Sequence, residues 1–192
     1  MASPSSGSSP RKRELLELAY AYALDHGLAD ISLRPLAAAI GSSPRVLLFL
    51  FGSKDDLTRA LLARARHDEL AMLEAVSRDH PDIDLAGAAA RVWEWLSGPQ
   101  RRPLLTLWAE GYARSLTEPT GPWSGFAERT VRDWLAVLAH FQPPRQRRSA
   151  PGEVERTAVL AVLRGALLDL LATGDLARTT TAVHEQLTHI TT

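Results

Sequence analysis

Apolar residues recur along most of the chain at intervals of three and four positions, the spacing that puts them on one face of an α-helix. The first such segment begins at Leu15, and Gly27 supplies its C-terminal stop. No segment alternates apolar and polar residues over a useful length, so strands are not expected. The pattern predicts an all-α protein of about nine helices.

Two short helices are predicted within residues 32–51. Ser32 is a suitable N-cap for the first, and Gly41 ends it. Ser43 followed by Pro44 repeats the start signal, because proline fits the first position of a helix. An amphipathic helix followed by helix, glycine-containing turn and helix is the layout of a three-helix DNA-binding head. The second short helix would then enter the major groove.

A longer helix is predicted from Ser53, and five more helix-length segments follow it. The breaks around those segments lie at Pro81, 98–103, 118–125, 142–152 and Gly174. Segment 154–173 is apolar almost all round, so it must be covered on more than one side. Such coverage near the chain end suggests self-association, although a central core helix would have the same composition.

The composition narrows the function classes. Lys plus Arg and Asp plus Glu each number 22, which excludes a uniformly basic nucleic-acid binder but allows a locally basic surface. The absence of cysteine removes thiolate nucleophiles, disulfides and cysteine zinc sites, and it suits a reducing cytoplasm. No run approaches the roughly 18 apolar residues of a bilayer crossing. We therefore expect a cytoplasmic protein with no membrane partner.

The start of the chain is rich in serine and proline rather than apolar, which argues against a secretory signal. It predicts a disordered tail over residues 1–13, because this composition cannot bury enough apolar surface to offset the entropy lost on ordering. Arg11, Lys12 and Arg13 end the tail. They form either a solvated patch or an arm that lies on phosphates.

One group of residues in the first third of the chain has the register of a known family. The group consists of Ser32-Leu33-Arg34-Pro35-Leu36-Ala37, Ile40-Gly41-Ser42-Ser43, Leu47, Phe51-Gly52-Ser53-Lys54 and Leu57. In these residues the sequence resembles the tetracycline-repressor (TetR) family of transcriptional regulators, over about 15–62. The resemblance implies a helix-turn-helix DNA-binding domain at 14–52 and a ligand-binding and dimerisation domain at 53–192. It also implies a homodimer built largely from the last two long helices.

The resemblance further implies which residues contact an operator in double-stranded DNA. The matching positions are Arg34, Ser42, Ser43, Pro44, Arg45, Val46 and Lys54. Arg45 is able to form two hydrogen bonds with a guanine edge, an interaction that contributes about 1 to 3 kcal/mol of discrimination. The Lys54 ammonium, together with nearby helix amides, would hold a phosphate.

Leu48, Phe49 and Leu50 depart from the family pattern, which usually has a tyrosine and then histidine or other polar residues here. None of these side chains can donate a hydrogen bond, and we expect at least one to be partly exposed. Phe49 is counted among the DNA-binding residues because it could contact a thymine methyl group. The head either binds DNA with fewer phosphate contacts or has lost DNA binding, which would leave a helical dimeric module that senses a ligand or a protein.

Large aromatic residues gather in the second part of the chain. Trp93, Trp108, Tyr112 and Trp134 lie on the inward faces of three successive predicted helices and could line a cavity, although any single ring could simply belong to the core. Within the apolar segment 154–173, Arg164 and Asp169 each need a partner, either across the bundle or dimer or on a ligand, and we favour pairing. We expect a small apolar or aromatic effector, with these four rings and Arg164 as its candidate binding residues.

The mechanism implied by the resemblance is a two-state linkage. A ligand in the body would shift the helix that begins near Ser53 and so change the separation of the two heads, which must match half-sites about 34 to 36 Å apart. Only a ligand with different affinities for the two states can do this. The function expected is therefore a repressor that a small effector releases from its operator. Activation is the alternative that the sequence leaves open.

An enzyme is the alternative to a DNA-binding regulator that we consider from a different class of function. The motif His67-Asp68-Glu69 superficially resembles a ligand set, but consecutive residues splay around a helix, whereas two metal ligands on one helix need a separation of three or four. The acidic and histidine residues of 80–84 lie in a proline-containing connection and are expected to be solvated. No glycine-rich phosphate loop, nucleophile elbow or paired-histidine metal motif is present. We predict that the chain is not an enzyme and has no cofactor or metal site.

Overall fold

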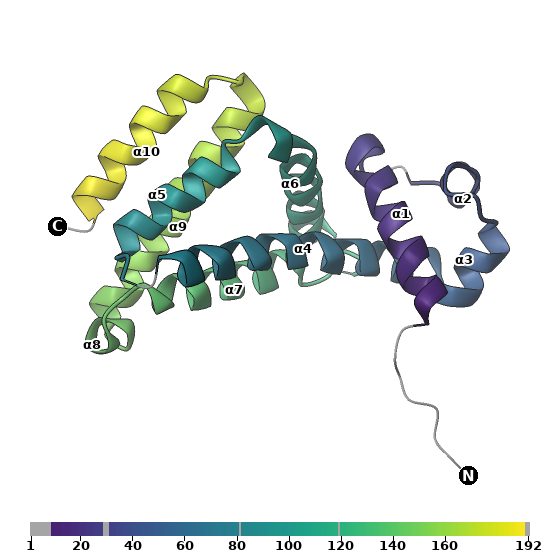
Figure 1. Ribbon diagram of the computed structural model, residues 1–192, viewed down its shortest axis with the longest axis horizontal. Helices are drawn as coiled ribbons and strands as arrows, with labels where there is room; N and C mark the ends of the chain where they lie inside the picture. The colour runs from purple at the N-terminus through teal and green to yellow at the C-terminus, as the bar shows by residue number, and fades with distance from the viewer. Residues whose placement is uncertain (1–8, 29–30, 81, 119, 191–192) are drawn as a thin grey trace, which may run out of the picture.

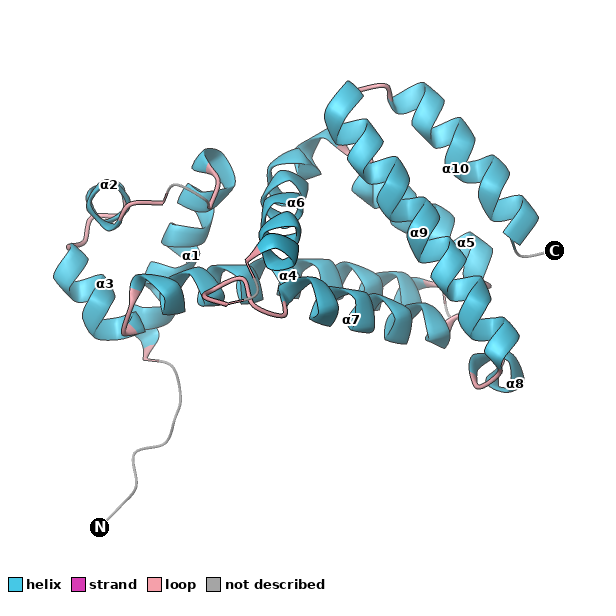
Figure 2. Cartoon of the chain, turned by 180° about the vertical axis from the view of Figure 1, so that it is seen from behind, coloured by secondary structure: helices cyan, strands magenta, loops and turns pink. Residues whose placement is uncertain are grey.

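The computed structural model describes residues 9–28, 31–80, 82–118 and 120–190. Within them the chain is built from α-helices with no strand, so the all-α prediction is confirmed (Figures 1 and 2). The elements are α1 (Pro10–His26), α2 (Leu33–Ala39), α3 (Pro44–Phe51), α4 (Lys54–Asp79), α5 (Leu85–Leu96), the 3-10 turn η1 (Pro99–Arg101), α6 (Arg102–Thr117), α7 (Phe126–His140), α8 (Pro144–Arg147), α9 (Ala150–Thr173) and α10 (Leu176–Ile190).

Helices α1 to α3 form a small head at one end of the elongated molecule, and the other helices form a body at the opposite end (Figure 1). The inner face of α1 packs on α2 and α4 through fully buried residues such as Leu15 and Ala19. From α3, Leu47 and Phe51 point into the same core. Gly52 has a φ of +91°, a conformation that favours glycine, and it ends α3.

Helix α1 begins earlier than the sequence pattern predicts. The Ser9 hydroxyl accepts a hydrogen bond from the Lys12 amide at 3.2 Å, and Pro10 occupies the first turn. The basic residues Arg11 to Arg13 therefore belong to a helix and not to the expected tail, and Arg11 pairs with Glu14 at 2.9 Å. The rest of the predicted tail, residues 1–8, lies outside the described residues.

Helix α4 connects the head to the body. The Ser53 hydroxyl caps it by accepting from the Asp56 amide at 3.0 Å. Its first turns contact α1 and α3 of the head, and the helix then continues without a break along α5, α6 and α7. Figure 2 shows the same arrangement from behind, with α6 rising from α4 between head and body. A displacement of α4 or α6 therefore changes contacts in both the head and the body.

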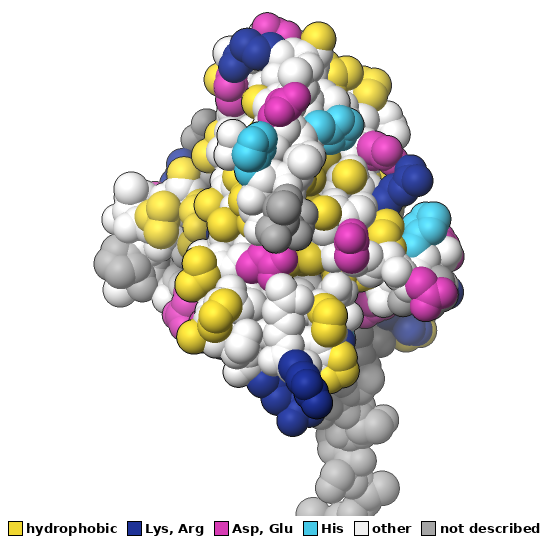
Figure 3. Space-filling view, turned by 90° about the vertical axis from the view of Figure 1, so that its left-hand side faces the viewer, with side chains coloured by type: hydrophobic (Ala, Val, Ile, Leu, Met, Phe, Trp, Pro, Cys, Tyr) yellow, Lys and Arg dark blue, Asp and Glu magenta, His cyan; other side chains and the backbone are white. Residues whose placement is uncertain are grey.

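The body closes around α9, which contacts α5, α6, α7 and α10. Helix α9 starts at Ala150 because Ser149 caps it, which is earlier than the predicted start at 154, and the short α8 fills part of the predicted break. Its residues Leu160, Leu163 and Leu167 are buried inside the chain. On its other side Val154 and Leu168 stay exposed. Hydrophobic side chains are interspersed with polar ones over the end of the body around α10 (Figure 3).

Across the described residues, no single helix is long and apolar enough to cross a membrane. Only α2 and α3 taken together reach that length and hydropathy, and they are bent by 101° at the break between them.

Candidate nucleic-acid interface and effector cavity

Helix α3 presents two different faces. Leu47 is buried in the head, and Ser43 caps the helix by accepting a hydrogen bond from the Val46 amide at 3.3 Å. Arg45, Val46 and Phe49 are exposed on the opposite face, where Phe49 lies four positions after Arg45 and three after Val46, the spacings of neighbours on a helix surface. The candidate reading residues thus share one outward face.

The three basic candidates are all accessible. Arg34 on α2, Arg45 on α3 and Lys54 at the start of α4 are exposed, and none of them forms an ion pair with another described residue. An unpaired guanidinium or ammonium on a surface is available to a phosphate or a base edge. Their charges therefore lie where a DNA duplex could contact them.

The turn residues are less accessible than the basic ones. Ser42, Ser43 and Pro44 are half-buried. The Ser43 oxygen is occupied by the cap of α3, and the Ser42 hydroxyl is buried without a partner among the described residues. These residues shape the turn as well as bordering the candidate interface.

The apolar run on α3 is exposed as expected. Phe49 is 86% exposed and Leu48 is 41% exposed, while Leu50 is half-buried. Together these exposed side chains offer apolar area that a partner surface can bury. Phe49 lies one turn along α3 from Arg45, so a surface that accepts one would also meet the other.

The start of α4 carries its own anion. The Ser53 hydroxyl donates to Asp56 at 2.6 Å, and this hydrogen bond lowers the pKa of the Asp56 carboxyl, which therefore stays charged. The Asp56 amide already donates to Ser53, so it is not available to a phosphate. The Lys54 ammonium is therefore a stronger candidate for holding a phosphate than this helix amide.

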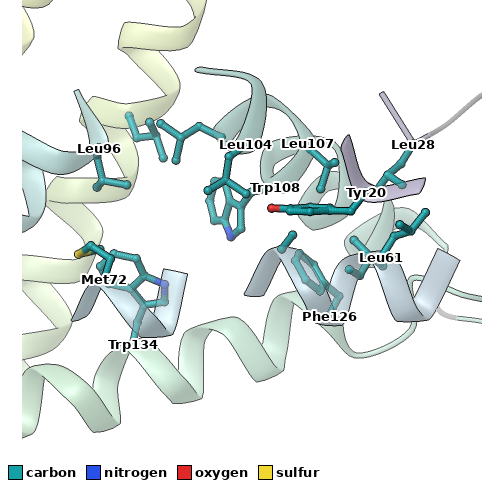
Figure 4. Packing of buried hydrophobic residues seen from close by; sticks show 14 of the residues in the cluster. Tyr20, Leu28, Leu61, Met72, Leu96, Leu104, Leu107, Trp108, Phe126 and Trp134 are labelled. Atoms are coloured by element: carbon teal, nitrogen blue, oxygen red, sulfur yellow. The ribbon is translucent and has the colours of Figure 1, made fainter. Parts of the chain in front are cut away.

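The body contains a small cavity of about 20 Å³, measured as the space open to the centre of a water molecule. It lies between α4, α5, α6, α7 and α9. Its lining residues are Glu69, Leu96, Leu105, Trp108, Trp134, Leu160, Leu163, Arg164 and Leu167. In Figure 4, Trp108 descends from α6 and Trp134 rises from α7 toward the same interior space. Three of the five candidate ligand residues, Trp108, Trp134 and Arg164, thus border one cavity.

The other two candidates have different positions. Trp93 is fully buried, but its indole nitrogen donates to the Thr180 hydroxyl of α10 at 3.0 Å, so it joins α5 to α10 and does not line the cavity. Tyr112 lies just outside the cavity wall, where its hydroxyl accepts a hydrogen bond from Arg164 at 3.3 Å. Helix periodicity identified these rings as inward-facing but could not say which helix each one meets.

Arg164 pairs across the bundle with the Tyr112 hydroxyl, to which its guanidinium donates at 3.3 Å, and forms no ion pair with a carboxylate among the described residues; pairing across a dimer stays a prediction. Its guanidinium lies over the rings of Trp108 and Tyr112, with 5.9 and 5.1 Å to the ring centroids. Asp169 does pair, with Arg178 of α10 at 2.6 Å, but on an exposed surface. The two residues are five positions apart and therefore face different neighbours.

Glu69 is the residue that the sequence reasoning missed. It is only 3% exposed, and among the described residues its carboxyl group accepts a hydrogen bond from the Trp134 indole nitrogen at 3.3 Å. Burial raises the pKa of the Glu69 carboxyl to about 8. Its position three residues before the buried Met72 and four after the buried Ala65, on the apolar face of α4, was the available signal.

Three buried polar atoms of the cavity residues have no partner among the described residues. They are Glu69 Oε1, Trp108 Nε1 and Arg164 Nη2. A buried polar atom without a hydrogen bond costs about 1 to 3 kcal/mol, so such atoms are uncommon in a finished core. All three atoms belong to residues that border one apolar cavity, which makes this cavity the candidate effector site.

Cavity residues on α4 and α6 lie next to residues that contact the head. On α4, Asp68 precedes Glu69 and accepts a hydrogen bond from the Tyr20 hydroxyl of α1 at 2.9 Å. On α6, Glu110 lies two residues after Trp108 and accepts from the Leu28 amide, just after α1, at 2.9 Å. A shift of either helix at the cavity would therefore strain a bond to the head.

No group of three or more histidine or acidic side chains suited to a metal ion occurs in the part of the chain that the structure describes. In the segment His67-Asp68-Glu69, whose spacing argues against a ligand set, Asp68 faces α1 and Glu69 borders the cavity, the splayed arrangement expected of consecutive helical residues.

No protein-family model and no curated protein sequence matches the chain. Solved structures do match it over nearly its whole length. The multidrug binding protein EbrR, in a complex with imidazole, is 26% identical with a TM-score of 0.70, and the match covers 98% of this chain and 97% of EbrR. A transcriptional regulator from Rhodococcus sp. Rha1 is 22% identical with a TM-score of 0.72, covering 93% and 95% of the two chains. The TetR transcriptional regulator from Legionella pneumophila is 16% identical with a TM-score of 0.66, covering 95% and 96%.

EbrR has also been solved with proflavin, in a structure that is 27% identical to this chain with a TM-score of 0.66. These neighbours are transcriptional regulators and a ligand-binding protein rather than enzymes, in agreement with the prediction from the sequence. Because the matches include the body as well as the head, the likeness extends well beyond the residues in which the sequence resembles the family.

Proposed function

Because the chain has the fold of the TetR-family transcriptional regulators, we propose that it is a DNA-binding regulator that represses transcription until a small apolar or aromatic effector releases it from its operator. The observation that carries this proposal is the surface of the head, where Arg34, Arg45 and Lys54 are exposed and form no ion pair among the described residues, and where the exposed ring of Phe49 lies one turn of α3 from Arg45. Such a surface is stable without DNA and suited to binding it.

Each exposed residue has its own proposed role on the duplex. Arg45 reads a guanine edge in the major groove, because a guanidinium can donate two hydrogen bonds to it. Arg34 and Lys54 bind backbone phosphates on either side. Phe49 contacts a thymine methyl group or a sugar, which replaces polar backbone contacts with buried apolar area. Ser42, Ser43, Pro44 and Val46 border this contact and shape the approach of α3.

Release by an effector follows from the contacts of α4 and α6. A molecule larger than water must displace the side chains around the cavity to enter it, and α4 and α6, which carry some of those side chains, are bonded to the head through Asp68 and Glu110. The effector must favour the shifted state to release DNA. That EbrR is described as multidrug binding and has been solved with imidazole and proflavin supports an effector site in the body of this fold.

A homodimer is part of the proposal. The exposed apolar residues Val154 and Leu168 of α9 and Leu176 of α10 leave a surface on these two helices that a second copy could cover. Two heads related by a twofold axis would then contact two half-sites about one helical turn, 34 to 36 Å, apart.

The test is selection of bound sequences from a random duplex pool, followed by affinity measurements on the selected site. Arg45→Ala should lower affinity for that site by about fivefold to more than a hundredfold while changing affinity for unrelated DNA little. Lys54→Ala should weaken both and reduce the salt slope by about one. Arg132→Ala, an exposed arginine of the body, is the matched control.

The second candidate is a dimeric helical sensor of a ligand or protein that does not bind DNA. It is favoured by the exposed apolar side chains of Leu48 and Phe49, where family members usually have polar contacts. If no sequence is enriched from the pool even at low salt, this second candidate replaces the first.

A further inference from the structure

Building on the proposed effector cavity, we infer that its ligand is a small organic anion, an aromatic or aliphatic carboxylate, whose carboxylate is bound by Arg164 and Trp108 while its apolar part lies among the leucines. This inference rests on the body cavity of the proposed function and adds the chemical class of the effector. It concerns the ligand alone and does not depend on DNA binding.

Among the residues that line the cavity, buried donors without a partner outnumber buried acceptors without one. Arg164 Nη2 and Trp108 Nε1 are both buried donors without a partner among the described residues, and both residues line the cavity. A carboxylate has two oxygen atoms that accept hydrogen bonds, so it can satisfy both donors at once. A cation or an apolar molecule would leave both of them unsatisfied.

The guanidinium of Arg164 is held in position before any ligand arrives. Its Nη1 donates to the Tyr112 hydroxyl at 3.3 Å, and the rings of Tyr112 and Trp108 lie against it. A guanidinium fixed in this way loses little side-chain entropy when it binds a carboxylate, and the forked geometry of its donors matches the two oxygens. Its positive charge has no carboxylate partner within the described residues, so an anion would supply the missing charge.

Glu69 does not cancel that charge near neutral pH. Since burial raises the pKa of its carboxyl to about 8, Glu69 is mostly protonated at pH 7 and can act as a donor. The charged groups that act on it are Arg164 of α9, Arg66 of its own helix and Asp133 of α7. Arg66 and Asp133 form an ion pair, so their charges compensate each other and Arg164 supplies the net charge at the cavity.

The remaining lining favours a flat or unbranched apolar group. Five leucines and the ring of Trp134 complete the wall. The present volume of about 20 Å³ holds about one water molecule, so a ligand must push side chains apart to enter. Small probes are therefore the appropriate ones.

The experiment compares benzoate, benzamide and benzamidine, which have nearly the same shape and carry a negative, no and a positive charge. Binding to the full-length protein is measured by calorimetry and tryptophan fluorescence in the absence of DNA. We expect benzoate to bind most tightly and benzamidine most weakly, with a ratio of about tenfold or more, the range of one hydrogen bond to a charged group.

Variants separate the roles of the cavity groups. Arg164→Gln should abolish the preference for benzoate, and Arg164→Lys, which keeps the charge but not the fork, should keep part of it. Trp108→Phe should weaken benzoate and leave benzamidine unchanged. The matched control is Arg101→Gln, because the Arg101 guanidinium also lies over a tryptophan ring, that of Trp95 at 4.6 Å, but does not line the cavity.

The pH dependence gives an independent readout. Benzoate affinity of the unmodified chain should fall as pH rises above about 8, because ionised Glu69 repels the anion, and Glu69→Gln should remove this fall. Tighter binding of benzamidine that depends on Glu69, or no binding of any of the three probes, would overturn the inference. A protein that binds benzoate but enriches no DNA sequence would overturn the proposed function and leave this inference intact.

Discussion

The head and the body place their functional groups in opposite environments. In the head, Arg45 and Phe49 are in contact with water, while the core beneath them is built from residues such as Leu47 that do not touch a partner. In the body, Glu69 and Trp108 are at the same time core residues and cavity lining. Stability and function are therefore separable in the head and coupled in the body.

This difference has a physical cause. A duplex is far larger than the head and can be met only by an exposed surface, whereas a small ligand gains affinity by being enclosed and removed from water. A ligand site inside the protein needs polar atoms in the interior. Each of these atoms lowers the stability of the ligand-free protein as long as it has no hydrogen-bond partner. The three atoms without a partner, on Glu69, Trp108 and Arg164, are the places where the body loses this stability.

Replacement of Glu69 by glutamine should give the largest effect on stability. The unfolded Glu69 carboxyl ionises near its usual pKa of 4.5, while the folded one stays protonated up to about 8, so the native state loses stability as pH rises between these values. Glutamine cannot ionise, and Glu69→Gln should be more stable than the unmodified chain at pH 8, by up to about 5 kcal/mol, with the gain vanishing toward pH 4.

Urea unfolding at several pH values measures this gain. The control is Glu74→Gln, an exposed glutamate of the same helix, which should show no such pH dependence. Equal stability of Glu69→Gln and the unmodified chain at pH 8 would mean that Glu69 is charged in the folded body, and the contrast between head and body would lose its best example.

Removal of Glu110 tests the bond between the two regions. Its carboxylate accepts from the Leu28 amide, and a hydrogen bond to a charged group contributes about 1.5 to 3 kcal/mol. Glu110→Ala should speed hydrogen exchange at the Leu28 amide and weaken the effect of an effector on DNA affinity. Glu118→Ala is the control, because Glu118 also pairs with Arg114 but makes no contact with the head that the structure describes. Unchanged exchange at Leu28 would argue that this bond does not connect the regions.

Replacement of Phe49 should give the smallest effect on stability. It is therefore the clearest test of whether function and stability rest on different residues in the head. Because its ring is 86% exposed, Phe49→Ala should change the free energy of unfolding by no more than about 0.5 kcal/mol while weakening binding to the selected operator. Phe51→Ala, two residues later on the buried face at 7% exposure, should destabilise the chain by about 3 to 5 kcal/mol. Thermal and urea unfolding of both variants measure these effects. A large loss of stability in Phe49→Ala would contradict the separation of function and stability in the head.

Local signals in the sequence were sufficient for most of the helices and for the exposed face of α3. N-caps such as Ser43 and Ser53, and stops such as Gly52, act within one helical turn, so they can be recognised without knowing the fold. The start of α1 has a local signal too, because Ser9 and Pro10 form the same N-cap and first-turn proline as Ser43 and Pro44. This signal does not enter the prediction from the sequence, because the polar composition around these residues predicts a disordered tail.

The cavity was decided by tertiary structure. Periodicity correctly marked Trp93 and Trp108 as inward-facing, yet one of them joins α10 and the other lines the cavity, because the rotation and spacing of neighbouring helices depend on contacts between residues far apart in the sequence. Whether Glu69 is protonated and what Arg164 touches depend on the same distant neighbours. The sequence alone therefore determined most of the helices and the exposed face of α3, while only the packed body determined which polar groups border one cavity.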